Sequence, residues 1–314
     1  MQTIQIVNVL LFDAFSNHCL ANAIEPLRAA NTLSRQALYE WRFFTLDGAP
    51  VASSSGLLIS PHGPVTDARG DLLMVMPSYR FQSHATWETA RGLKAASKRH
   101  RRTAGLDTGS WLMADAGLLG GYRATIHWEE LIGFGEAFPD VDVCRERFVI
   151  DRDRITCSGA MATFDLVLHL IAKDHGPLLA MEVGQLFMSR TEAGLVTAQR
   201  TASGRLVQRA IDVMQQNLEE PLTLAAIARE LGSTQKSMSQ KMQRELKATP
   251  QAVYRRLRLG LARKLVQESD LAVSEIAGRC GYENASAMTR AFGQEFAVSP
   301  SQLRRHLDRD AQWG

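Results

Sequence analysis

The sequence predicts an open α/β sheet domain followed by an all-helical domain. Three observations lead to this expectation: a length of 314 residues, strand patterns that alternate with helix patterns in the first part, and helix patterns alone after Gly204. The length exceeds that of one ordinary core, so about two domains are expected. Apolar residues make up 45% and charged residues 22% of the chain, a balance that excludes a disordered or fibrous protein.

The first part of the chain carries short apolar runs typical of strands buried in a parallel sheet, the clearest over residues 71–76. The expected strands are residues 4–12, 41–46, 71–76, 103–106, 141–143, 148–150 and 154–157. The expected helices are residues 19–33, 108–117, 127–138, 161–174 and 177–188. Strands that alternate with helices imply parallel crossover connections and an open sheet. The basic run 98–102 and His84 are expected at a solvated helix end.

The small polar segment 200–204 has the composition of a short linker. We therefore expect a first domain over residues 1–198 and a second domain over residues 204–314. From Gly204 onward 17 Lys and Arg stand against 12 Asp and Glu, a net charge of +5. The preceding residues carry 19 against 21, a net charge of −2, so the basic excess lies in the second domain.

The second domain contains an internal repeat. The matched pairs are Leu222 and Leu271, Ile227 and Ile276, Ala228 and Ala277, Gly232 and Gly281 at an offset of 49 residues, and Met238 and Met288, Glu245 and Glu295, Pro250 and Pro300 at an offset of 50. Each copy is a short helix, a glycine turn and a longer helix, which is the outline of a helix-turn-helix. A helical bundle without DNA binding also shows scattered arginines, but matched positions in two copies favour the DNA-binding interpretation.

The expected helices of this domain are residues 206–218, 223–230, 235–246, 250–267, 273–279, 285–295 and 300–307. The helix over 250–267 joins the two copies and carries five basic side chains, Arg255, Arg256, Arg258, Arg263 and Lys264. Its length of roughly 27 Å is close to the roughly 34 Å between successive major grooves on one face of DNA. Both longer helices are therefore expected to enter successive grooves.

The motifs Leu222-Thr-Leu-Ala-Ala-Ile-Ala-Arg-Glu-Leu-Gly232 and Val273-Ser-Glu-Ile-Ala-Gly-Arg-Cys-Gly-Tyr282, with Met288-Thr-Arg-Ala-Phe292, resemble the DNA-binding domain of AraC-type transcription regulators. In that family the second helix of each motif reads base edges. The resemblance implies base or backbone contacts from Lys236, Ser239, Gln240, Ala285, Ser286, Thr289 and Arg290, and a buried stripe of Met238, Met242, Met288 and Phe292. Family members often carry Arg at the position of Gln240, so the bases that are read differ here.

The run Gly105-Leu-Asp-Thr-Gly-Ser-Trp-Leu-Met-Ala-Asp-Ala-Gly-Leu-Leu119 and the segment Arg123-Ala-Thr-Ile-His-Trp128 resemble the DJ-1/PfpI-like, glutamine-amidotransferase-like domain of GlxA-type AraC regulators. This resemblance implies a flavodoxin-like open sheet. In enzymes of that superfamily a cysteine occupies the sharp turn after the strand, where it becomes a nucleophile. Asp107 stands there in this chain, and a carboxylate cannot perform thiol chemistry. We therefore expect no catalytic residue and no enzyme.

Asp107 is the centre of the expected ligand site, because open α/β sheets bind ligands at the carboxyl ends of their strands. The expected ligand-binding residues are Asp107, Thr108, Ser110, Trp111, Phe15, His127 and Trp128. Aromatic faces attract ammonium groups, and the resemblance to GlxA-type regulators implies a nitrogenous metabolite, an amino acid or a quaternary amine. Two alternatives remain: Asp107 only caps the following helix, and His127 and Trp128 belong to the core.

A ligand-responsive transcription regulator is therefore the expected function, with double-stranded operator DNA, a small-molecule effector, RNA polymerase and a second copy of the chain as partners. The alternatives are an amidase- or hydratase-like enzyme of the DJ-1/PfpI superfamily with an accessory DNA-binding tail, and a structural adaptor. Cys19, Cys144, Cys157 and Cys280 form no CxxC pair, so neither a disulfide framework nor a metal site is expected, and no cofactor is implied. Residues 1–12 lack a basic leader pattern, which favours a cytoplasmic location without membrane insertion.

Overall fold

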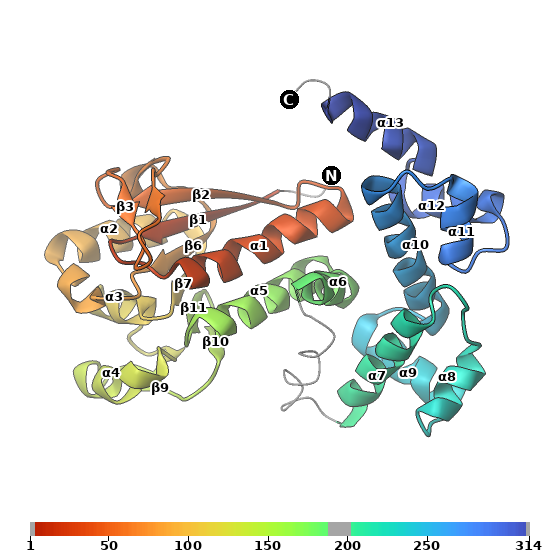
Figure 1. Cartoon of the computed structure of the whole chain (residues 1–314). Helices are drawn as coiled ribbons and strands as arrows, with labels where there is room; N and C mark the ends of the chain where they lie inside the picture. The colour runs from red at the N-terminus through yellow and green to blue at the C-terminus, as the bar shows by residue number, and fades with distance from the viewer. Residues whose placement is uncertain (1–3, 188–201, 312–314) are drawn as a thin grey trace. The chain divides into compact units, whose positions relative to one another are not determined.

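The computed structural model describes residues 4–187 and 202–311, and the chain divides into two compact units (Figure 1). The first unit takes the chain up to His175 together with Leu179–Phe187, and the second contains every helix from α7 (Ala202–Gln216) onward. The start of the expected linker, residues 200 and 201, lies outside the described residues. Its remainder, residues 202–204, begins helix α7.

The first unit is built on a seven-stranded sheet in the order β10-β11-β7-β6-β1-β2-β5. The strands are β1 (Gln5–Leu11), β2 (Tyr39–Thr45), β5 (Gly63–Pro64), β6 (Gly70–Met76), β7 (His100–Leu106), β10 (Phe148–Asp151) and β11 (Arg154–Cys157). All neighbours are parallel except β10 and β11. The chain moves outward from β1 to β2 and β5, then returns to β6 on the other side of β1. The sheet is thus flavodoxin-like, as predicted, with a topological switch point between β1 and β6.

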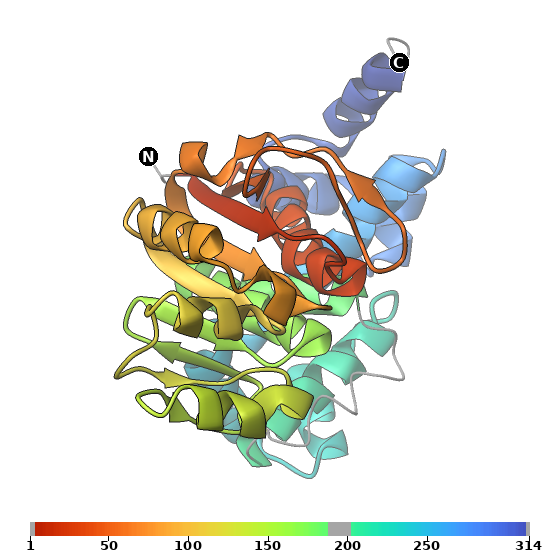
Figure 2. The ribbon, with the colours of Figure 1, turned by 90° about the vertical axis from the view of Figure 1, so that its left-hand side faces the viewer.

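Helices cover both faces of this sheet (Figures 1 and 2). One face packs against α1 (Asn17–Ser34) and α5 (Ala160–His175), and the other against α2 (Trp87–Ser97), α3 (Gly109–Asp115) and α4 (Leu131–Ala137). Alternate residues of β1 supply the two cores: Val9 faces α1 and α5, whereas Leu10 faces the other helices. Period-two alternation with both faces buried explains the continuous apolar runs of the central strands.

Several short elements have no counterpart among the predicted ones. They are α2 and the strands β3 (Val51–Ala52), β4 (Leu58–Ile59), β5 and β8 (Arg123–Ala124), of which β8 pairs with β9 (Asp142–Val143). The helix expected over 127–138 is a 3-10 turn, Trp128–Glu130, followed by the short helix α4. The described part of the first unit ends with residues 179–187 of helix α6 (Pro177–Phe187).

The expectation of a solvated helix end over residues 98–102 is wrong. Strand β7 begins at His100, and both His100 and Arg102 are 8% exposed. The guanidinium of Arg102 lies 3.7 Å from the Asp174 carboxylate, and the His100 ring nitrogen Nδ1 lies 2.7 Å from the Ala96 carbonyl oxygen. Partners inside the protein therefore hold His100 and Arg102 within the strand. Because these residues are basic, the start of the strand lacks the apolar pattern by which strands are predicted.

The second unit consists of seven described helices: α7, α8 (Leu224–Glu230), α9 (Gln235–Leu246), α10 (Pro250–Glu268), α11 (Val273–Arg279), α12 (Ala285–Phe296) and α13 (Pro300–Ala311). The start of each longer repeat helix is capped by a side chain. Thr234 Oγ1 accepts from the Ser237 amide at 3.1 Å, and Asn284 Oδ1 accepts from the Ala287 amide at 2.8 Å. The predicted buried stripe is confirmed, because the side chains Met238, Met242, Met288 and Phe292 are all fully buried.

Candidate effector pocket and nucleic-acid interface

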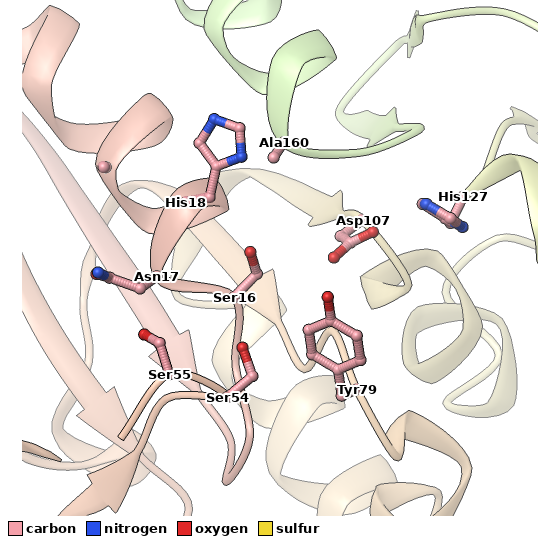
Figure 3. A pocket seen from close by; sticks show the side chains of 10 residues that line it. Ser16, Asn17, His18, Ser54, Ser55, Tyr79, Asp107, His127 and Ala160 are labelled. Carbon is pink, nitrogen blue, oxygen red and sulfur yellow. The ribbon is translucent and has the colours of Figure 1, made fainter. Parts of the chain in front are cut away.

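A pocket of about 470 Å³ opens at the carboxyl ends of the central strands (Figure 3). Its lining residues are Ser16, Asn17, His18, Ala21, Ser54, Ser55, Tyr79, Asp107, His127 and Ala160. The first four of these follow β1, Tyr79 follows β6, and Asp107 follows β7. The pocket therefore lies beside the switch point between β1 and β6, which is where open α/β sheets bind ligands.

Asp107 occupies a sharp turn between β7 and α3. Its backbone is left-handed, with φ of 60°. The turn requires glycine on both sides, because a Cβ at Gly105 would lie 2.6 Å from the Ser110 amide nitrogen and one at Gly109 would lie 2.1 Å from the Val75 carbonyl oxygen. This strand-turn-helix geometry presents the Asp107 side chain at the pocket, where the Tyr79 hydroxyl points toward its carboxylate (Figure 3).

Burial dominates the electrostatics of Asp107. Removal from water raises the pKa of its carboxyl group, while the neighbouring Ser78 hydroxyl and the charge of His127 act in the opposite direction. Thr108, not Asp107, is the N-cap residue of α3, and the Thr108 hydroxyl donates to the Ser78 carbonyl oxygen at 2.7 Å. The Asp107 carboxylate thus lines the pocket rather than serving as the N-cap of α3.

The loops around the pocket are held by backbone hydrogen bonds between segments far apart in sequence. The Ala14 amide donates to the Ala52 carbonyl oxygen and the Ser54 amide to the Phe15 carbonyl oxygen, both at 2.8 Å. Ala14 and Ser78 are left-handed, like Asp107, with φ of 61° and 55°. Such non-glycine residues cost about 1–3 kcal/mol each and cluster at ligand sites.

The pocket contains two of the seven expected ligand residues, Asp107 and His127. Phe15 is fully buried in the core beneath α1 and offers no ring to the pocket. Trp111 packs against Phe81 and Phe138 on the α2 and α3 face, with ring centroids 5.3 and 5.2 Å away. The expectation of several aromatic faces around Asp107 is therefore not met by the pocket lining.

The other expected ligand residues also lie apart from the pocket. Thr108 and Ser110 are buried in the first turn of α3, at 6% and 0% exposure. Trp128 is 65% exposed, so it belongs neither to the pocket lining nor to the core that the alternative interpretation assigned to it. His127 is held by its amide, which donates to the Asp107 carbonyl oxygen at 3.1 Å.

Sequence reasoning missed most of the polar lining. The missed polar residues are Ser16, Asn17, His18, Ser54, Ser55 and Tyr79. These residues lie in short polar loops that follow strands, and such loops have no distinctive sequence pattern. The strand order that brings the loops together is not visible in the sequence.

The thiols near this pocket are poor nucleophiles. Cys19 and Cys157 are buried, and burial raises the pKa of Cys157 to about 11 and that of Cys19 well above its ordinary value. All four cysteines are free. Within residues 4–187 and 202–311 no group of three or more His, Cys, Asp or Glu side chains is placed to hold a metal ion.

The candidate nucleic-acid interface lies on α9 and α12, on the side away from the buried stripe. Lys236 and Gln240 are exposed on α9, and Ser286 and Arg290 are exposed on α12. The remaining expected contacts, Ser239, Ala285 and Thr289, are half-buried. At the offset of 50 residues Lys236, Ser239 and Gln240 match Ser286, Thr289 and Arg290, whereas Ala285 has no counterpart in the first set.

The connecting helix α10 presents fewer basic side chains than its composition implies. Arg255 and Lys264 are exposed. Arg256 lies 3.5 Å from the Glu295 carboxylate, Arg258 bonds to backbone carbonyls, and Arg263 is only 8% exposed. Three of the five basic residues therefore contribute to packing and hydrogen bonding inside the unit.

Comparison with known proteins matches residues 227–306 to a helix-turn-helix domain family. The chain is 36% identical to the HTH-type transcriptional regulator CdhR of Pseudomonas aeruginosa, over 95% of this chain and 91% of that protein. It is 31% identical to the HTH-type transcriptional regulator GlxA of Rhizobium meliloti, over 97% of both chains.

Solved structures of an AraC family regulator and of a ThiJ/PfpI family protein are also similar to this chain. An AraC family transcriptional regulator from Pseudomonas putida is similar with a TM-score of 0.52 and 26% identity, over 59% of this chain and all of that one. A ThiJ/PfpI family protein from Pseudomonas syringae has a TM-score of 0.51 at 17% identity, over 81% of this chain and 91% of that one, which shows the fold. No helix among residues 4–187 and 202–311 is both long and apolar enough to cross a bilayer.

Proposed function

The chain belongs to the AraC-type helix-turn-helix transcription regulators of the GlxA branch, and on that premise we propose how it recognises DNA and effector. The second helix of each motif, α9 and α12, reads operator DNA in successive major grooves. The pocket beside Asp107 takes a small nitrogenous metabolite, an amino acid or a quaternary amine. The chain is a regulator and not an enzyme, since its relatives over nearly the whole length are regulators.

The observation that supports the effector assignment most is the partly buried carboxylate of Asp107 in its pocket. Apart from Ala21 and Ala160, the other lining side chains carry hydroxyl, amide or imidazole groups. A cationic nitrogen restores the favourable surroundings that the carboxylate loses on burial. The hydroxyls of Ser16, Ser55 and Tyr79 supply hydrogen-bond partners for the polar remainder of the ligand.

Ligand binding at the strand ends controls DNA binding by favouring one of two arrangements that differ in affinity for the effector. Domains 1–198 and 204–314 serve as the sensing and the DNA-binding parts. The regulator acts in the cytoplasm as a homodimer, with RNA polymerase as a further partner.

Calorimetry of the full chain tests the effector assignment. The probes are matched pairs of an amino acid and its N-trimethylated counterpart, such as glycine and glycine betaine, each titrated into the parent chain and into Asp107→Asn. We expect one member of a pair to bind the parent chain. The Asn variant is expected to bind that ligand about 10- to 150-fold more weakly, the magnitude typical of losing an interaction with a charged group. Equal binding by both chains removes Asp107 from the site.

A further inference from the structure

The two glycine turns of the repeat have unequal surroundings although their positions match. Gly232 and Gly281 are both left-handed, with φ of 61° and 70°. A Cβ at Gly232 would meet nothing within 4 Å. A Cβ at Gly281 would lie 2.5 Å from Pro221 Cγ and 2.6 Å from the Leu218 carbonyl oxygen. The turn of the second motif thus packs directly against the segment that leads into the first motif.

Arg258 of α10 holds the same turn from the other side. Its Nε donates to the Cys280 carbonyl oxygen at 2.7 Å and its Nη2 to the Gly281 carbonyl oxygen at 2.6 Å. The guanidinium also lies 4.2 Å from the centre of the Tyr282 ring. Hydrogen bonds from a charged group are stronger than neutral ones, so this contact fixes the turn on α10.

Tyr254, one turn earlier on α10, holds the segment that precedes the first motif. Its hydroxyl donates to the Asn217 carbonyl oxygen at 2.5 Å and accepts from the Leu222 amide at 3.2 Å. Residues four apart lie on the same face of a helix. One face of α10 therefore binds both the segment 217–222, which leads into the first motif, and the turn 280–281 of the second motif.

We propose that these contacts form an inter-motif joint, made of segment 217–222, Tyr254, Arg258 and Gly281, that fixes the distance and angle between α9 and α12. The joint makes the number of base pairs between the two operator subsites a determinant of specificity. One added base pair rotates the second subsite by roughly 34–36° about the DNA axis, which a rigid pair of helices cannot follow. The proposal rests on the proposed function, because it requires both motifs to bind one duplex.

Rigidity also raises affinity. Once one motif is bound, the second is held near its groove at a high effective concentration, and less conformational freedom is lost on binding. A loosened joint therefore weakens binding to a duplex with both subsites but leaves binding to a single subsite unchanged. This difference separates a positioning role from a merely structural one.

The test compares Gly281→Ala with Gly232→Ala in the full chain. Both variants place a methyl group on a left-handed residue, so they share the backbone strain, and only Gly281→Ala adds the contact with Pro221 and Leu218. The probes are a duplex selected from a random-sequence pool by the parent chain, its versions with one base pair added or removed between the subsites, and a duplex with one subsite. Arg258→Lys is the second joint variant, because it keeps the positive charge but lacks the planar fork that places Nε and Nη2 on the two carbonyl oxygens.

We expect the parent chain and Gly232→Ala to lose about tenfold or more in affinity when the spacing changes by one base pair. Gly281→Ala and Arg258→Lys lose about tenfold on the selected duplex, respond less to spacing, and bind the single subsite like the parent chain. Equal affinity of the parent chain for all spacings overturns the proposal, as does a spacing profile of both joint variants that matches Gly232→Ala. A parent chain that binds no duplex at all overturns the proposed function itself.

Discussion

Replacing Asp107 with Asn is expected to stabilise the folded protein in the absence of effector. The carboxylate is partly buried, and burial raises its pKa, so the charged form is disfavoured in the folded state. Asn has nearly the same shape and carries no charge to desolvate. The expected gain is about 1 kcal/mol at neutral pH, because a charged group with incomplete partners costs more to remove from water than a neutral amide of the same shape.

The sign of the pH dependence follows from the raised pKa. The folded state binds the Asp107 proton more tightly than the unfolded state, so the parent chain loses stability as the pH rises from the ordinary carboxyl range through the folded-state pKa. The advantage of Asp107→Asn is therefore full at neutral pH and disappears in acid, below the ordinary carboxyl pKa. Each kcal/mol corresponds to about 2–4 °C in the melting temperature of a domain of this size.

Urea unfolding of both full-length chains, followed between pH 4 and pH 8, measures this effect. Asp151→Asn is the matched control with the opposite sign, because hydrogen bonds from Arg152 and from the Arg123 amide lower the pKa of the Asp151 carboxyl group. That variant is expected to lose stability at neutral pH relative to the parent chain, and the loss fades as the pH falls. An Asp107→Asn protein that is less stable than the parent chain at pH 7 would refute the argument that desolvation destabilises the Asp107 carboxylate when no cationic ligand is bound.

Three further outcomes are expected. Phe292→Ala removes a fully buried ring from the core of the second motif, so denaturant unfolding is expected to show a loss of about 3–5 kcal/mol, and a loss below 1 kcal/mol contradicts the packing. Asn284→Ala removes the cap of α12 and is expected to cost about 1 kcal/mol in the same assay, whereas an unchanged midpoint shows that the cap bond contributes nothing. Arg290→Ala is expected to weaken binding to the selected duplex by about 1–3 kcal/mol and relax preference at one base pair. Gel-shift titrations against single-base variants check this, and undiminished preference everywhere argues against base contact by Arg290.

Most helices of the second unit could be predicted from the sequence to within one residue, but α7 begins four residues earlier and α13 ends four residues later than predicted. Local signals decide them: apolar spacing, glycine turns, and prolines at the first position of α10 and α13. The buried stripe of Met238, Met242, Met288 and Phe292 follows from the same helical period. The joint at Gly281 could not be foreseen, because both glycine turns have the same local pattern and only tertiary packing distinguishes them.

The pocket shows a similar division. Asp107 and its sharp turn could be predicted from the resemblance of the run 105–119 to a known turn, and the structure adds the reason for the glycines on either side. The prediction of Trp111 as a ligand residue is wrong because tryptophan is common both in ligand sites and in cores. The orientation of α3 turns its ring toward Phe81 and Phe138. Ser54 and Ser55 reach the pocket through the β3–β4 turn, whose two-residue strands are too short to leave a pattern.

A dimethyl sulfate protection experiment on a selected duplex tests most directly whether α9 and α12 enter successive major grooves. This reagent modifies guanine N7, which lies in the major groove. The full chain should protect guanines in two patches whose centres are about 10–10.5 base pairs apart on one face of the DNA. Arg290→Ala should remove protection from methylation only in the patch that α12 contacts. A single protected patch in the parent complex, or two patches on opposite faces of the duplex, would contradict simultaneous entry of α9 and α12 into neighbouring grooves.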